Sequence, residues 1–276
     1  MNNIFDICQN GNYKTVKQFL QENCTENNID INAKNNNGET PLHIVCKRDD
    51  IKIVELLLAF GADPQIVSSD FWEITPVVNA CYNNNLDIMK LLIRSYYDIY
   101  KTDYKGDTLL HSACNTVNIN INIIKYLIEE CEMEINKKNN EGMTPFHYAC
   151  WCSTEGKTDV RVLKYLLDKG AKINDKDIND RNPLYCAMFN SFLIDDNNYD
   201  VVKFLLENGA STNTTFDHYI GCTLLDFVCT HGQLNIIELL YEHGVDFRSE
   251  NSYGKTPYMI ACENNHKHVM EYLKYK

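Results

Sequence analysis

The sequence has few of the residues that mark several specialised classes of protein. Its 276 residues include 2 Trp, 6 Pro and 12 Gly, and no two glycines are spaced G-x-G. Neither the dinucleotide-binding fingerprint nor a kinase glycine loop is therefore present. No C-x-x-C, G-x-S-x-G, H-E-x-x-H or Walker sequence occurs either. The sequence thus gives no support to a zinc ribbon, a serine hydrolase, a zinc protease or a P-loop nucleotidase.

Basic residues are scarce relative to acidic ones. Lys and Arg number 26 against 38 Asp and Glu, which gives a net charge of −12. Such a surface repels phosphate backbones, so we expect no binding of nucleic acid. We also expect no membrane contact, because there is no basic run and no stretch approaching the roughly 20 apolar residues of a membrane helix. The first residues lack the pattern of a signal peptide, and we expect a cytoplasmic protein, with the nucleus as the alternative.

What the sequence does contain is an internal repeat. Segments such as GETPLHIVC, GMTPFHYAC and GKTPYMIAC recur, and each is followed by an apolar run of helical period such as IKIVELLLAFGAD. Successive copies of the anchoring Thr are separated by 35, 33, 36, 38, 41 and 33 residues, with Asn in one copy. The anchors are Thr40, Thr75, Thr108, Thr144, Asn182, Thr223 and Thr256.

This T-P-L-H-x-A pattern at a period near 33 residues resembles the ankyrin repeat family. The match spans residues 1–276, with FDICQNGNYKTVKQFL as a degenerate first copy. The resemblance implies an all-α solenoid of stacked helix-turn-helix units with β-hairpin fingers, about eight repeats including caps. It also implies a single domain in a stand-alone repeat protein. We expect the repeats at residues 1–34, 35–69, 70–102, 103–138, 139–176, 177–217, 218–250 and 251–276.

Elementary helix chemistry supports the same unit. Thr caps a helix, and proline fits the first helical position because its missing N–H has no partner there. Five of the six prolines follow an anchor directly. Ala80, Ala113 and Ala149 are examples of the small residue at the fifth position after the anchor, which allows close helix packing. Gly61 ends a second helix and is expected to be a left-handed cap. One such helix pair cannot bury its apolar faces alone, so stacking must supply the partner surface.

The cysteines and histidines are explained by their positions in the repeat. Seven cysteines hold the sixth position after the anchor, where free Cys packs as a small hydrophobe: Cys8, Cys46, Cys81, Cys114, Cys150, Cys229 and Cys262. Cys152 and Cys222 lie off that position and are expected to be more exposed. His43, His111 and His147 are expected to bond neighbouring loop backbone. His266 and His268 are expected to point to different sides.

No group of residues pairs a nucleophile with a base. Asp175, Asp177 and Asn179 resemble the start of a calcium loop, but Asp180 and Cys186 replace its glycine and its bidentate glutamate. We interpret this segment as an acidic loop between repeats. We therefore predict that the protein is not an enzyme and that it has no catalytic residues, no metal and no cofactor.

The resemblance implies that the protein binds a partner protein through a concave groove. The contact sites of the family are positions four, three and one before the anchor, and seven and eight after it. Aromatic residues can also fill gaps between fingers, but both tryptophans of the chain fall at these positions. The candidate partner-binding residues are Phe71, Trp72, Ile74, Tyr82, Tyr104, Met143, Trp151, Phe189, Tyr219, Ile220 and Tyr253.

Three functions remain open at this point. We expect an adaptor or scaffold that acts as a monomer and binds a protein partner with a basic patch, which the acidic charge would attract. The alternative is a stoichiometric inhibitor of a partner enzyme or transcription factor. A third hypothesis is a thiol redox sensor that uses Cys152 or Cys222. The identity of the partner is not encoded in the repeat pattern, because the family fixes the scaffold and varies the contacts.

Overall fold

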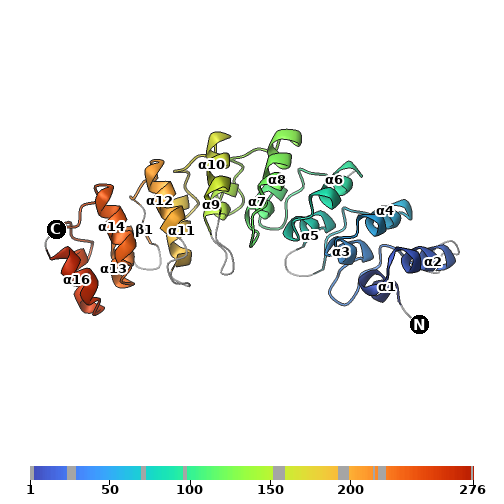
Figure 1. Ribbon diagram of the computed structural model, residues 1–276, viewed down its shortest axis with the longest axis horizontal. Helices are drawn as coiled ribbons and strands as arrows, with labels where there is room; N and C mark the ends of the chain where they lie inside the picture. Colours follow the sequence, from blue (N-terminus) through green and yellow to red (C-terminus); the bar gives the residue numbers. More distant parts are fainter. Residues whose placement is uncertain are drawn as a thin grey trace. The chain divides into compact units, whose positions relative to one another are not determined.

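The computed structural model describes residues 3–23, 29–69, 73–95, 98–151, 159–191, 199–213, 215–216, 222–274 and 276. The chain forms two compact units (Figure 1). The first consists of residues 1–116 and 120–134, and the second of residues 117–119 and 135–276. Both units are built from pairs of antiparallel helices joined by loops.

In the first unit, the first helices of successive pairs pack in the order α1, α3, α5, α7, and the second helices α2, α4 and α6 pack beside one another. In the last pair of this unit, the second helix is α8, and it continues into a π-helical turn, η1. The bounds are α1 (Ile4–Asn10), α2 (Tyr13–Asn23), α3 (Pro41–Cys46), α4 (Ile51–Ala59), α5 (Pro76–Tyr82), α6 (Leu86–Arg94), α7 (Leu109–Cys114), α8 (Ile121–Lys125) and η1 (Tyr126–Glu130).

The second unit repeats this arrangement. The helices α9 and α11 pack together, as do α13 and α15, while α10, α12 and α14 form the second row. The bounds are α9 (Pro145–Cys150), α10 (Val160–Asp168), α11 (Pro183–Ser191), α12 (Tyr199–Glu207), β1 (Thr215–Phe216), β2 (Cys222–Thr223), α13 (Leu224–Thr230), α14 (Leu234–Glu242), α15 (Pro257–Glu263) and α16 (Lys267–Leu273). The predicted all-α repeat fold is confirmed.

The fingers between helix pairs are tight turns more often than strands. In the described residues, ladder pairing is confined to β1 and β2, which are antiparallel with Phe216 opposite Cys222. The other described fingers close through short-range backbone hydrogen bonds, such as those from the Asn139 N–H to the Met143 carbonyl and from the Gly142 N–H to the Asn139 carbonyl, both at 2.9 Å. The Asn139 side chain accepts further bonds from the N–H groups of Glu141 and Met143. An Asn or Asp side chain thus holds the turn in place of a longer ladder.

The anchoring Thr and the His three residues later form a capping box. The Nδ1 atom of His43 accepts from the Thr40 N–H at 3.1 Å, and its Nε2–H donates to the Ile74 carbonyl in the next finger at 2.8 Å. The same box occurs at Thr108 with His111. The expected bond from the ring to neighbouring loop backbone is confirmed for His43 and for His147, whose Nε2 lies 3.3 Å from the Arg181 carbonyl. One imidazole therefore caps its own helix and also fixes the next finger.

The residues at the fifth and sixth positions after the anchor form the core between inner helices. Ala80, Ala149, Cys81 and Cys150 are fully buried. Burial raises the pKa of the Cys81 thiol to about 12, so the thiol stays protonated at neutral pH. The prediction that these cysteines pack as hydrophobes is confirmed for the buried ones. Cys262 on the last inner helix is only half-buried.

A second set of bonds joins the loops that follow the second helices. In the second unit, Asn136 donates to the Gly170 carbonyl at 2.9 Å and Asn174 donates to the Gly209 carbonyl at 3.0 Å. The Asn174 side chain also accepts from the Ser211 N–H at 2.7 Å. Gly170 and Gly209 have φ of 94° and 85°, a left-handed conformation that a side chain would strain. Gly61, the predicted left-handed cap, has φ of 90°, so that prediction is confirmed.

The loop bonds lead to a test of stability. We predict that Asn174→Ala lowers the free energy of unfolding by about 1–2 kcal/mol, because it removes two hydrogen bonds between adjacent repeats. Asn179→Ala is the matched control, since this exposed side chain has no described hydrogen bond, and it should change stability by less than about 0.5 kcal/mol. Urea unfolding followed by circular dichroism measures both. Equal stability of the two variants would contradict the role of Asn174.

Candidate protein-binding surface

Two positions in each repeat present side chains beside the finger and the inner helix. They are the residue directly before the anchor, in the finger, and the residue seven after it, at the end of the inner helix. We call these two residues a contact pair. The pairs with both side chains described are Glu39 with Lys47, Ile74 with Tyr82 and Asp107 with Asn115 in the first unit, and Met143 with Trp151, Arg181 with Phe189 and Lys255 with Glu263 in the second.

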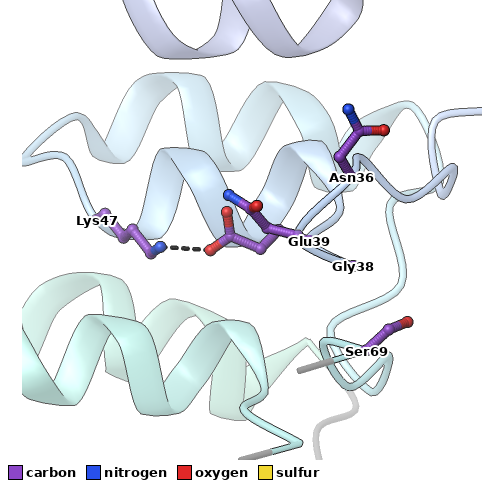
Figure 2. A pocket seen from close by; sticks show the side chains of 6 residues that line it. Asn36, Gly38, Glu39, Lys47 and Ser69 are labelled. Atoms are coloured by element: carbon purple, nitrogen blue, oxygen red, sulfur yellow. Dashed lines mark hydrogen bonds and ion pairs between the residues drawn. The ribbon is translucent and has the colours of Figure 1, made fainter. Parts of the chain in front are cut away.

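The first contact pair forms the wall of an open polar pocket. Figure 2 shows Glu39 and Lys47 joined by an ion pair, with Ser69 of the next loop across from them. The pocket measures about 440 Å³ and is also lined by Asn36, Asn37 and Gly38. Gly38 has φ of 75°, and a Cβ there would lie 2.2 Å from the Ser69 backbone nitrogen. Close approach of neighbouring fingers thus requires glycine at this turn.

The middle pair of the first unit carries an aromatic ring. Tyr82 is 41% exposed. Desolvation, with the charges of Asp103 and Asp107 as smaller contributions, raises the pKa of Tyr82 to about 12 despite a hydrogen bond with Ser112. The phenol is therefore neutral at physiological pH. Part of this residue is exposed to solvent, near the acidic groups of Asp103 and Asp107.

The second unit brings its aromatic residues together across two repeats. Trp151 and Phe189, the inner-helix members of successive contact pairs, lie with ring centroids 5.8 Å apart. Phe189 stacks on Tyr185 at 5.7 Å with an interplanar angle of 10°. The guanidinium of Arg181 stands over the Tyr185 ring at 5.6 Å. We call Arg181, Tyr185, Phe189 and Trp151 the aromatic ladder. Such clusters are typical of protein interfaces.

The first and last of these contact pairs each join a glutamate to a lysine, but the order of the two residues along the chain is reversed. Glu39 precedes its anchor and Lys47 follows the helix, whereas Lys255 precedes its anchor and Glu263 follows, with Nζ and Oε2 2.7 Å apart. The same two positions thus accept either order of an ion pair. Both side chains of the Lys255–Glu263 pair are exposed, so this pair contributes little to stability, whereas Glu39 of the other pair is only 13% exposed.

The predicted partner-binding residues differ in how far the structure exposes them. Tyr82 and Tyr253 are exposed, at 41% and 60%. Ile74, Tyr104, Trp151 and Phe189 are half-buried. Met143 is only 4% exposed and packs under its finger, so it offers little surface to a partner. Phe71, Trp72, Tyr219 and Ile220 lie outside the described residues.

One exposed residue on the same surface was missed from the candidate set. Ile178 is 69% exposed at the tip of its finger, and its N–H bonds to the Glu141 carbonyl of the preceding finger. It stands four residues before Asn182, which is one of the contact positions of the repeat. Its position in the repeat is therefore the sequence signal that identifies it as a contact residue.

The terminal histidines correct one expectation. His266 and His268 were predicted to point to different sides, but both rings turn to the same loop. Their Nε2 atoms each lie 2.8 Å from a carbonyl oxygen, of Thr230 and Gly232 respectively. His266 is the N-cap of α16, with a non-helical φ of −82° and ψ of 77°, so the helical rotation that the prediction assumed does not separate it from His268. The bonds fasten the last repeat to the previous one.

Further chemistry finds no support in the described part of the chain. No group of three or more His, Cys, Asp or Glu side chains there could hold a metal ion. Asp177 accepts from the N–H groups of Asn179 and Arg181, so the segment once compared with a calcium loop is an ordered turn. Among the described residues, no helix is long and apolar enough to cross a membrane. Cys152 and the side chain of Cys222 lie outside the described residues.

Comparison with known proteins agrees with this architecture. A sequence model described as ankyrin repeats (3 copies) matches residues 4–103, 77–177, 154–216 and 194–276. The chain belongs to the ankyrin repeat family. Ankyrin repeats are protein–protein interaction modules that do not act as enzymes, which agrees with a surface built from contact pairs.

Similar proteins come from unrelated organisms. Alpha-latrocrustotoxin-Lt1a of Latrodectus tredecimguttatus is 28% identical over 98% of this chain and 21% of its own length. The putative ankyrin repeat protein FPV232 of fowlpox virus (strain NVSL) is 27% identical over 86% of this chain and 53% of its own length. The B-cell lymphoma 3 protein of Homo sapiens is 30% identical over 81% and 47%. The chain thus spans between about a fifth and half of these relatives.

The buried capping histidines predict a loss of stability in acid. Desolvation lowers the pKa of His147 to about 4, against about 6.5 when unfolded. The unfolded state therefore binds more protons below pH 6.5, so stability present above that pH is lost as pH falls toward 4. We expect His147 to account for a loss of about 1–2 kcal/mol between pH 7 and pH 5.

Two measurements check this expectation. Nuclear magnetic resonance of the imidazoles should show His147 still neutral at pH 5. Urea unfolding at both pH values should show a shallower pH dependence for His147→Gln, whose side chain does not titrate. A His147 ring that titrates near pH 6.5 in the folded protein would contradict the predicted desolvation.

Proposed function

We propose that this chain is an adaptor or scaffold that binds a partner protein through its contact pairs and finger tips. The observation that carries the proposal is the aromatic ladder, with Trp151 and Phe189 half-buried at equivalent positions of successive repeats. Neither ring is needed by the capping boxes or the loop bonds that hold the repeats together. Their placement at an accessible edge therefore supports a role in recognition, where aromatic residues contribute most of the binding energy.

The charge of the protein supports a partner with a basic patch. The net charge is −12, and Asp103 and Asp107 lie beside the exposed ring of Tyr82. Long-range attraction accelerates the encounter of oppositely charged partners and weakens as salt rises. We expect the association rate to fall several-fold between 50 mM and 300 mM salt, with a smaller effect on dissociation.

Binding should depend on the contact pairs and finger tips and not on aromatic residues outside them. The test captures partners from cell lysate with the wild-type chain and with a Tyr82→Ala/Trp151→Ala/Phe189→Ala variant, followed by mass spectrometry and titration of the captured protein. We expect the triple variant to weaken binding at least a hundredfold, since each such residue contributes about 1–2 kcal/mol or more. Circular dichroism verifies its fold.

The control variant is Tyr100→Ala/Tyr13→Ala. Both tyrosines are exposed, at 72% and 40%, but neither belongs to a contact pair. This variant should bind as the wild type does. A partner that binds the triple variant with unchanged affinity would refute the proposed surface. If the captured partner is an enzyme or transcription factor and loses activity at one-to-one stoichiometry, the adaptor role gives way to that of an inhibitor.

We further propose that the chain acts as a monomer in the cytoplasm or nucleus. Support for a monomer comes from the first repeat, where the exposed side chains of α1 and α2 are polar apart from Tyr13. Sedimentation equilibrium tests the assembly state, because Tyr258 and Met259 on α15 expose 37% and 49% of their surface. A concentration-dependent dimer that Met259→Glu disrupts would contradict the proposal.

A further inference from the structure

Arg181 stands out among the charged residues of the contact pairs. Its Nε donates to Oδ2 of Asp177 at 2.7 Å, and the two side chains are 18% and 1% exposed. Within the part of the chain that the structure describes, no residue accepts a hydrogen bond from the two terminal nitrogens of this guanidinium. A partly buried guanidinium whose terminal NH₂ groups have no acceptor among the described residues is a strong donor site.

The aromatic ladder fixes the position of this guanidinium. Arg181 lies over Tyr185, which is 1% exposed and stacked on Phe189. Asp177 holds the other edge of the guanidinium through the Nε bond. The side chain is therefore restrained on two sides before any ligand arrives, which reduces the entropy lost on binding. Phe189 and Trp151 extend the ladder as an apolar surface.

This inference rests on the proposed function and names the chemistry of one contact within it. We propose that Arg181 binds a carboxylate of the partner, while Trp151 and Phe189 pack against a large apolar side chain next to that carboxylate. The two terminal nitrogens of a guanidinium match the two oxygens of a carboxylate in a bidentate pair. Arg181 and Phe189 both contact Tyr185, at 5.6 and 5.7 Å from its ring centroid, and Trp151 in turn contacts Phe189. The partner segment is thus an Asp or Glu adjacent to an aromatic or aliphatic residue.

The local charge favours a carboxylate over a phosphate. Asp177 already neutralises Arg181, so the pair has no net charge to offset a dianion. A singly charged carboxylate gains two charge-assisted hydrogen bonds and meets less repulsion from Asp177. The contact is compatible with a basic partner, because it concerns one acidic residue within the segment that reaches the ladder.

The repeat itself supplies the variants for a test. The preceding finger has Asn139 and Met143 where this finger has Asp177 and Arg181. Asp177→Asn/Arg181→Met therefore gives the finger a combination that the fold already accommodates, including the Asn that holds the turn. Asp177→Asn alone keeps the turn and leaves Arg181 without its competing carboxylate. Circular dichroism and urea unfolding verify that both variants fold.

The probe is a phage-displayed library of random 12-residue peptides, selected on the immobilised wild-type chain. We expect enriched peptides to carry Asp or Glu next to a large apolar residue. A synthetic peptide of that kind should bind the wild type about tenfold or more tightly than its Glu→Gln counterpart. Asp177→Asn should raise the affinity for the acidic peptide several-fold. The double variant should bind both peptides equally.

The outcomes separate this inference from the proposed function. Enriched peptides that need Trp151 and Phe189 but show no preference for an acidic residue would overturn the carboxylate contact and leave the binding surface intact. A double variant that still prefers the acidic peptide would also overturn the carboxylate contact and leave the binding surface intact. A library that yields no binder, or binders indifferent to Tyr82→Ala/Trp151→Ala/Phe189→Ala, would overturn both. A preference for phosphorylated peptides over their Glu equivalents would replace the carboxylate with a phosphate.

Discussion

The fold depends on hydrogen bonds that leave one repeat and end in the next. An isolated helix pair in this chain would expose the apolar side of its inner helix, and the buried Ala and Cys residues show that neighbouring pairs cover it. The histidine of the capping box also links its repeat to the one that follows it. His43 holds Thr40 at the start of its own helix and the Ile74 carbonyl in the following finger, so the spacing between the two repeats is fixed at the inner helices. Asn174 fixes it again at the outer loops, through Gly209 and Ser211.

Much of this frame could be predicted from the sequence because it repeats. A threonine followed by a proline indicates a helix start, and a glycine after an apolar run indicates its end. The structure places these residues as expected. The π-helical turn at Tyr126–Glu130 could not be predicted, since the apolar run there resembles that of α10 apart from one extra residue and the lack of a capping glycine. Glu132 has φ of 52° at the place where the following repeat has Gly170.

The candidate surface was predictable in position and less so in exposure. The repeat pattern assigns Met143, Arg181 and Glu39 to the same place before the anchor. It does not tell that the Met143 side chain turns inward, that Arg181 pairs with Asp177, or that Glu39 reaches Lys47. These outcomes depend on which neighbouring groups each side chain can reach. A long apolar side chain such as Met143 is buried, whereas a charged side chain forms an ion pair with a neighbouring residue.

The reversed ion pairs at the two ends have a consequence for how such a surface can change over evolutionary time. Glu39 with Lys47 and Lys255 with Glu263 occupy equivalent places in the same frame, and the capping threonines Thr40 and Thr256 beside them keep the same role. The backbone is thus indifferent to the sign of charge at either place. Changes to two codons would therefore exchange the acidic and the basic residue of one contact pair. A gene built of such units can acquire a preference for a new partner one repeat at a time, while its folded frame is inherited unchanged.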